Sequence, residues 1–249
     1  MAMRIRAAPL LLAVLLPLPA AAEPACHPLT HEGRGYVICS ADPATDDLRL
    51  FLRTEQGGIY GSFGRVNQAL AAGGETLAFA MNAGMYHPDR RPVGLYVENG
   101  KQEMRAVAPA GPGNFGMLPN GVLCLEDGRA EVIETRAYLA DPPDCRYATQ
   151  SGPMLVIDGA LHPRFLPDST SRHVRNGVGV DAAGRVHFAI SDAPVSFHEF
   201  ARLFRDVLET PNALYFDGKV SKLYAPALGR HDAGLPMGPI VGAVVPAGD

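Results

Sequence analysis

Short apolar runs interrupted by turn residues are the feature that most limits how this chain can fold. The sequence holds 27 glycines and 22 prolines, and they break its apolar residues into brief stretches. Such stretches between Gly and Pro turns are typical of β-strands, whereas helices need longer periodic segments. No repeat, linker or low-complexity segment divides the chain. We therefore predict one strand-rich α+β domain, with mixed sheets and one or two packed helices.

Two segments have the spacing of helices. Residues 62–72 end at Gly73-Gly74, a common helix stop. Residues 196–208 carry a stripe of phenylalanines and a leucine on one face. Strands are predicted at residues 36–40, 48–54, 76–81, 95–98, 117–125, 154–157, 186–190 and 213–216.

The N-terminus is typical of a secretory signal peptide. Two arginines precede an apolar run from Ala7 to Leu16, and three alanines end the segment at Ala22. The run is too short to span a membrane, so no stable membrane insertion is expected. We predict removal of residues 1–22, with residues 23–249 forming a periplasmic or secreted domain. A lipoprotein anchored at Cys26 is the alternative, although the aliphatic residue expected just before such a cysteine is missing.

Four cysteines in an exported chain predict two disulfides. Pairing between near neighbours, Cys26 with Cys39 and Cys124 with Cys145, is favoured among the three possible connectivities. No C-x-x-C pair indicates a zinc site. The net charge of −4 and the lack of any Lys/Arg run argue against a nucleic-acid partner.

A polar, basic stretch from Ser169 to Asp192 holds the first candidate site residues. Arg172 and Arg175 precede Asn176 and Gly177. Guanidinium groups capture phosphate or carboxylate through paired N–H donors, and glycines let backbone amides approach an anion closely. The other interpretation is that both arginines pair with carboxylates on the protein surface.

Two more segments place polar residues directly after predicted buried strands. Asn82 and Gly84 follow one strand, and Asp217-Gly218 follows another, with Ser221 close behind. An amide or carboxylate in such a position can line a site, although Asp-Gly after a strand is also a common turn.

Two familiar motifs fail on inspection. Residues 111–116, G-P-G-N-F-G, match the dinucleotide-binding fingerprint, but a strand is predicted next where the fingerprint needs a helix. His198-Glu199 opens a zinc motif, but Arg202 stands where the second histidine is required.

Four segments together resemble the phosphodiester glycosidase family, most closely its short exported bacterial members. They are residues 81–84 with Pro92 and Gly94, residues 114–116 with Asn120-Gly121, residues 175–179 with Asp192, and Asp217-Gly218 with Ser221. The resemblance spans about residues 76–225. The family includes the lysosomal enzyme that removes N-acetylglucosamine from a phosphodiester, which has D-G-G-G-S where this chain has D-G-K-V-S at 217–221 and Arg-Thr-Ala where it has Arg175-Asn176-Gly177.

The resemblance implies hydrolysis of a sugar 1-phosphodiester in a small molecule or glycan. No cofactor is indicated, and metal dependence and oligomeric state stay open. Arg175 would hold the phosphate, and Asp217 or Asp192 would act as nucleophile or as base for water; His173 is a secondary candidate. We expect Arg175→Ala to reduce turnover without loss of stability. The implied substrate-binding residues are Asn82, Gly84, Arg172, Asn176, Gly177, Gly218 and Ser221.

Three other function classes stay open. A non-catalytic periplasmic module that binds phosphorylated envelope glycans would keep Arg175 and Asn82 without needing both aspartates. A serine hydrolase is disfavoured because the sequence has no G-x-S-x-G and pairs no serine with His173 or His198. A structural, disulfide-stapled domain is the third.

Overall fold

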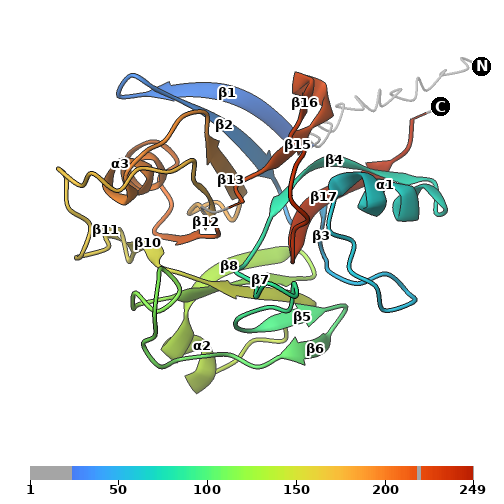
Figure 1. Ribbon diagram of the computed structural model, residues 1–249, viewed down its shortest axis with the longest axis horizontal. Helices are drawn as coiled ribbons and strands as arrows, with labels where there is room; N and C mark the ends of the chain where they lie inside the picture. Colours follow the sequence, from blue (N-terminus) through green and yellow to red (C-terminus); the bar gives the residue numbers. More distant parts are fainter. Residues whose placement is uncertain (1–23, 218–219, 249) are drawn as a thin grey trace, which may run out of the picture.

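The computed structural model describes residues 24–217 and 220–248, so the predicted signal peptide and Gly218 lie outside the described residues. Strands dominate this part of the chain and form three sheets (Figure 1). The predicted strand-rich α+β class is confirmed. Every pairing between named strands is antiparallel, where mixed sheets had been expected, because short hairpins such as β1–β2, β7–β8 and β12–β13 join neighbouring strands.

The largest sheet has the order β1-β2-β13-β12-β14-β10-β11. Its sixth strand, β10, is shifted in register against β14. The bounds are β1 (Ala25–His31), β2 (Arg34–Ala41), β10 (Met154–Ile157), β11 (Ala160–Leu161), β12 (Asn176–Val180), β13 (Val186–Ser191) and β14 (Asn212–Tyr215).

Two five-stranded sheets complete the architecture, with the orders β16-β15-β4-β17-β3 and β6-β5-β9-β7-β8. The first comprises β3 (Asp47–Phe51), β4 (Glu75–Asn82), β15 (Leu223–Ala225), β16 (Arg230–His231) and β17 (Ile240–Pro246). The second comprises β5 (Tyr96–Glu98), β6 (Lys101–Met104), β7 (Gly121–Glu126), β8 (Arg129–Glu134) and β9 (Tyr147–Ser151).

Both predicted helices are present, each starting at a serine cap. Ser62 caps α1 (Phe63–Ala71), and Ser196 with Glu199 forms a capping box on α3 (Phe197–Arg202), which continues as a π-helical turn, η1 (Leu203–Val207). A third helix, α2 (Thr135–Ala140), was not predicted, because its six residues make too few turns to show a helical period. A 3₁₀ turn, η2 (Pro226–Leu228), follows β15.

One central core joins the three sheets. Phe79 of β4 and Phe188 of β13 lie with ring centroids 5.5 Å apart, and Leu123 of β7 and Leu214 of β14 belong to the same cluster. Each helix packs in a cluster on a different sheet: α3 on the largest sheet, α1 on β4 and β17, and α2 on β5 and β7. No helix of the described residues is both long and apolar enough to cross a membrane.

Glycines within β12 let α3 and the segment after it pack close to the sheet. A Cβ on Gly177 would lie 2.6 Å from the carbonyl oxygen of Leu214 and 3.3 Å from the Phe200 ring. A Cβ on Gly179 would lie 2.6 Å from Thr210 Oγ1. These glycines therefore serve close packing inside the fold, and the buried strand that holds them was missed in the sequence.

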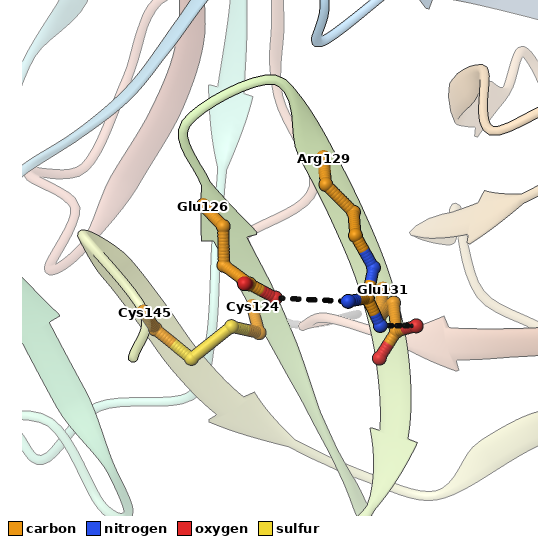
Figure 2. Close-up of a disulfide and its surroundings, with 5 residues drawn as sticks. All are labelled: Cys124, Glu126, Arg129, Glu131 and Cys145. Carbon is orange, nitrogen blue, oxygen red and sulfur yellow. Dashed lines mark hydrogen bonds and ion pairs between the residues drawn. A yellow bond between two sulfur atoms is a disulfide. The ribbon is translucent and has the colours of Figure 1, made fainter. Parts of the chain in front are cut away.

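Both disulfides have the favoured local pairing, Cys26–Cys39 and Cys124–Cys145, so this prediction is confirmed. The first joins directly opposed residues of β1 and β2. Figure 2 shows the second, which ties β7 to the segment that leads into β9. In the same view, Arg129 of β8 pairs with a glutamate on each strand of the hairpin, Glu126 and Glu131.

Candidate active site

Strand topology brings the predicted site segments to one end of the largest sheet. Because β12 runs antiparallel to β13 and β14, its first residue, Asn176, lies near the last residues of both neighbours. Asn82, at the end of β4 in another sheet, meets it there. Asn82 Nδ2 donates to Asn176 Oδ1 (3.3 Å), and Asn176 Nδ2 donates to the carbonyl oxygen (2.9 Å) and Oδ1 (3.1 Å) of Asn82. Both side chains are completely buried.

This amide pair also holds the segment after β14. The backbone N–H of Asp217 donates to Asn176 Oδ1 (3.4 Å), and that of Lys222 donates to Asn82 Oδ1 (2.9 Å). Ser221 Oγ lies 2.6 Å from the carbonyl oxygen of Asp217 and 3.2 Å from Asn176 Oδ1. The structure thus brings together Asn82, Asn176, Asp217 and Ser221.

Arg175 is completely buried on the α3 side of the same sheet. Its guanidinium carbon lies 3.6 Å from the centroid of the Phe197 ring and 5.4 Å from that of Tyr215. Nε donates to the carbonyl oxygen of Val195 (2.9 Å), and Nη2 donates to that of Ser171 (3.1 Å). Nη1 is buried without a partner among the described residues. Burial lowers the pKa of Arg175, and the nearby Tyr215 opposes that shift.

Two tyrosine hydroxyls share this property. Among the described residues, Tyr215 Oη and Tyr86 Oη are buried without a hydrogen bond of ordinary geometry. Burial, with a smaller contribution from the charge of Asp217, raises the pKa of each to about 12; Arg90 and the Gly238 backbone oppose the rise at Tyr86. The side chains of Arg175 and Asn114 lie near enough to Tyr215 Oη to oppose that rise. Both hydroxyls are therefore protonated at neutral pH and can donate a hydrogen bond.

Three buried polar atoms therefore lack a partner among the described residues: Tyr215 Oη and Tyr86 Oη, which are both close enough to Asp217 to be affected by its charge, and Arg175 Nη1, whose guanidinium lies beside Tyr215. We call them the donor cluster. A buried polar atom without a partner costs about 1–3 kcal/mol, so several in one place indicate a ligand that satisfies them. All three can donate, which suits an anionic ligand.

Sequence reasoning did not assign the two tyrosines of the donor cluster. Tyr86 lies two residues after the 81–84 segment that carries part of the family resemblance, and Asn114 opens the 114–116 segment. Tyr215 precedes Asp217 by two residues, but a tyrosine in an apolar strand is more often a core residue. The available signal for Tyr86 and Asn114 was their position beside or within the segments that carry the resemblance.

Two predicted site residues are engaged elsewhere. The carboxylate of Asp192 is exposed and pairs with Arg230 Nη1 (3.0 Å). Arg172 Nη1 pairs with Glu199 Oε2 (2.6 Å), as the surface-pairing interpretation predicts. Among the residues that the structure describes, neither side chain has a hydrogen bond or ion pair with the donor cluster. His173 is exposed as well.

Gly84 and Gly177, the glycines predicted to let backbone amides approach an anion, are packed against neighbouring parts of the protein. Gly84 N donates to Thr149 Oγ1 (3.2 Å), and a Cβ on Gly84 would lie 2.4 Å from the carbonyl oxygen of Gln150. Gly177 lies inside β12, between β13 and β14. The close approach that each glycine permits is therefore to neighbouring protein, in contrast to the expected approach to an anion.

A hollow of about 370 Å³ opens beside Ser221 and Lys222. Lys222 Nζ donates to the carbonyl oxygen of Leu235 (2.6 Å), and burial lowers the pKa of Lys222. Within residues 24–217 and 220–248, no three His, Cys, Asp or Glu side chains gather in an arrangement that could hold a metal ion.

Comparison with known proteins identifies the family to which this chain is related. The phosphodiester glycosidase family matches residues 75–233, which include Asn82, Arg175 and Asp217. The uncharacterized protein YigE of Escherichia coli is 30% identical over 210 residues, covering 84% of this chain and 82% of that protein.

Solved structures share the fold at low identity. The catalytic domain of zebrafish N-acetylglucosamine-1-phosphodiester alpha-N-acetylglucosaminidase, auto-inhibited by its pro-peptide, superposes with a TM-score of 0.60 at 12% identity, covering 87% of this chain and 80% of that one. A hypothetical protein from Synechocystis gives 0.57 at 13% identity, covering 88% and 61%. A putative exported protein from Burkholderia pseudomallei gives 0.55 at 12%, covering 84% and 74%. The family match and the YigE relationship show that this chain belongs to the phosphodiester glycosidase family.

Proposed function

We propose that this protein hydrolyses glycosyl 1-phosphodiesters, releasing a free sugar and a phosphate monoester. The observation that carries the proposal is the donor cluster: three buried polar atoms without a partner among the described residues, two of them close enough to Asp217 to be affected by its charge. A phosphodiester group carries one negative charge and two oxygens able to accept these hydrogen bonds. Family membership supports the same reaction class.

The chemistry asks for charge stabilisation more than for proton donation. When the bond at the anomeric carbon breaks, the departing group is a phosphate monoester, already a good leaving group. Preorganised donors stabilise the charge that grows on it, and Arg175 with the two tyrosines would supply them. A carboxylate on the sugar side supports the positive charge at the anomeric carbon, as nucleophile or as base for water.

Asp217 is the better candidate for that carboxylate. Its charge acts on both tyrosine hydroxyls of the donor cluster, whereas Asp192 is exposed and paired with Arg230. The neighbouring hollow of about 370 Å³ lies within the size range of small-ligand sites and offers room for the sugar or the aglycone.

We also propose that the protein works in the periplasm or outside the cell. Two disulfides favour an oxidising compartment, and the Burkholderia structural relative is described as a putative exported protein. The predicted signal peptide is consistent with this location.

The test uses the mature chain and the methyl phosphodiester of N-acetylglucosamine 1-phosphate, with released sugar as the readout. Asp217→Asn should lose at least about 100-fold in kcat, since it removes the carboxylate that supports the transition state. Asp168→Asn, at an exposed aspartate, serves as the matched control and should keep its rate.

Other outcomes would change the assignment. Full activity in Asp217→Asn together with loss in Asp192→Asn would pass the role to Asp192. Wild-type protein that binds glycosyl phosphodiesters across a panel of sugars without releasing sugar would refute hydrolysis and favour the glycan-binding module.

A further inference from the structure

A serine, a histidine and an aspartate form a hydrogen-bonded chain away from the donor cluster. Ser40 of β2 is the direct cross-strand partner of His187 of β13. Ser40 Oγ lies 2.8 Å from His187 Nδ1, and His187 Nε2 lies 3.0 Å from Asp181 Oδ2. Asp181 lies in the turn between β12 and β13. A nucleophile within hydrogen-bond reach of a base, itself oriented by a third group, is the signature of an activated serine.

The carboxylate is held in place for this task. Asp181 Oδ1 accepts the backbone N–H groups of Ala183 and Arg185, each at 2.9 Å, which leaves Oδ2 for His187. Burial acts to raise the pKa of Asp181, but the hydrogen bonds from His187 and the backbone outweigh it, and the pKa is lowered. Asp181 therefore stays ionised and accepts only.

The ionised carboxylate determines the tautomer of the histidine. Because Asp181 can only accept, neutral His187 carries its proton on Nε2. Nδ1 then presents a lone pair to the hydroxyl of Ser40, which donates to it. This is the order of a serine–histidine–aspartate triad, with the two ring nitrogens exchanged relative to the serine proteases.

The triad is separate from the donor cluster and stands on rigid elements. His187 and Ser191 are four positions apart in β13, a span of about 13 Å along a strand, and the backbone N–H of Ser191 donates to the carbonyl oxygen of Arg175. Cys39, the neighbour of Ser40, is bonded to Cys26 across β1 and β2. The side chains of His187 and Asp181 are 14% and 20% exposed, so solvent reaches the triad.

We propose that Ser40 is the nucleophile of a second reactive site that accepts small, unhindered acyl esters. Ser40 Oγ bonds to the ester carbonyl carbon while its proton passes to His187 Nδ1. The alkoxide then leaves and takes that proton, which gives an alcohol and an acyl-Ser40. Water repeats the sequence on the acyl group, releases a carboxylic acid and restores Ser40.

The experiment uses the mature chain and a fluorophosphonate probe, with labelling followed by intact mass and the labelled serine located by peptide mapping. We expect one label per chain, on Ser40, and p-nitrophenyl acetate hydrolysis that the probe abolishes. His187→Gln should slow labelling at least about 100-fold, the scale of losing a general base. Asp181→Asn should slow it as well, because an amide no longer fixes the tautomer. Ser169→Ala, at a serine outside the triad, should label like wild type.

Several results would overturn the proposal. They are no labelling of the wild-type chain, a label on another serine, or equal labelling rates in wild type and a folded His187→Gln variant. The wild-type mapping does not depend on whether any variant folds. Labelling is also independent of phosphodiester hydrolysis, so Asp217→Asn should label at the wild-type rate.

Discussion

Tyr215→Phe separates the functional and structural roles of the donor cluster. The change removes one oxygen and keeps the ring, which packs edge-on against Phe197 with centroids 4.8 Å apart. Tyr215 Oη is buried without a partner in the described structure, so its removal takes no protein hydrogen bond of ordinary geometry with it. We expect the variant to fold normally and to hydrolyse its substrate poorly.

The magnitudes follow from that geometry. Removing an unpartnered buried hydroxyl should leave the free energy of unfolding unchanged or raise it by up to about 1 kcal/mol, which is about 2–4 °C in Tm for a domain of this size. If Oη donates to the phosphate in the transition state, the lost charge-assisted bond is worth about 1.5–3 kcal/mol. That corresponds to a fall of about 10- to 150-fold in kcat/KM.

Sugar release and thermal melting measure the two effects side by side. Tyr147→Phe is the matched control, because Tyr147 Oη does have a partner, Asn99 Oδ1 at 2.7 Å. That variant should lose about 1 kcal/mol of stability and keep its activity. Unchanged kcat/KM in Tyr215→Phe would show that the hydroxyl does not touch the substrate, and a Tm loss larger than that of Tyr147→Phe would make it structural.

Two further predictions follow from the surroundings of the donor cluster. Arg175→Ala should lower the free energy of unfolding by about 3 kcal/mol or more, whereas the sequence led us to expect no loss of stability. The change leaves a cavity at a completely buried position and removes two hydrogen bonds and the stacking on Phe197. An unchanged urea midpoint would contradict this prediction. Burial acts to raise the pKa of Glu199, but the Ser196 N–H and Arg172 outweigh it and hold the pKa at about 2. Its stabilisation is therefore fully present above the unfolded value near 4.5 and is lost as the pH falls toward 2, so the stability difference between wild type and Glu199→Gln, measured by urea unfolding, should shrink over that window.

Local signals in the sequence predicted much of the fold. Helices were predicted at residues 62–72 and 196–208, and the structure has them with Ser62 and Ser196, the predicted first residues, as N-caps. The close spacing of the cysteines favoured the observed disulfides. Strand β12 was missed because Gly177 and Gly179 break its apolar pattern. Their value lies in close contact with β14 and with residues after α3, which no local pattern reveals.

The candidate site was predictable in part. Asp192 and Asp217 both follow strand ends, so the sequence pattern does not distinguish them as site candidates. They differ in their three-dimensional surroundings. Arg175 was identified as a candidate, but its burial depends on Phe197, which lies 22 positions further along the chain and reaches it only through the folding of α3. Contacts between residues so far apart in the chain cannot be predicted from a local sequence pattern.

The hydrogen bonds between Asn82 and Asn176 have a consequence for how activity arises. They connect residues 94 positions apart, one from each of two different sheets. A newly made chain that has assembled either sheet alone lacks this connection, so its candidate site residues are not yet aligned. Enzymatic activity should therefore appear only when the two sheets have docked against each other. Neither half of the polypeptide should be active after cleavage.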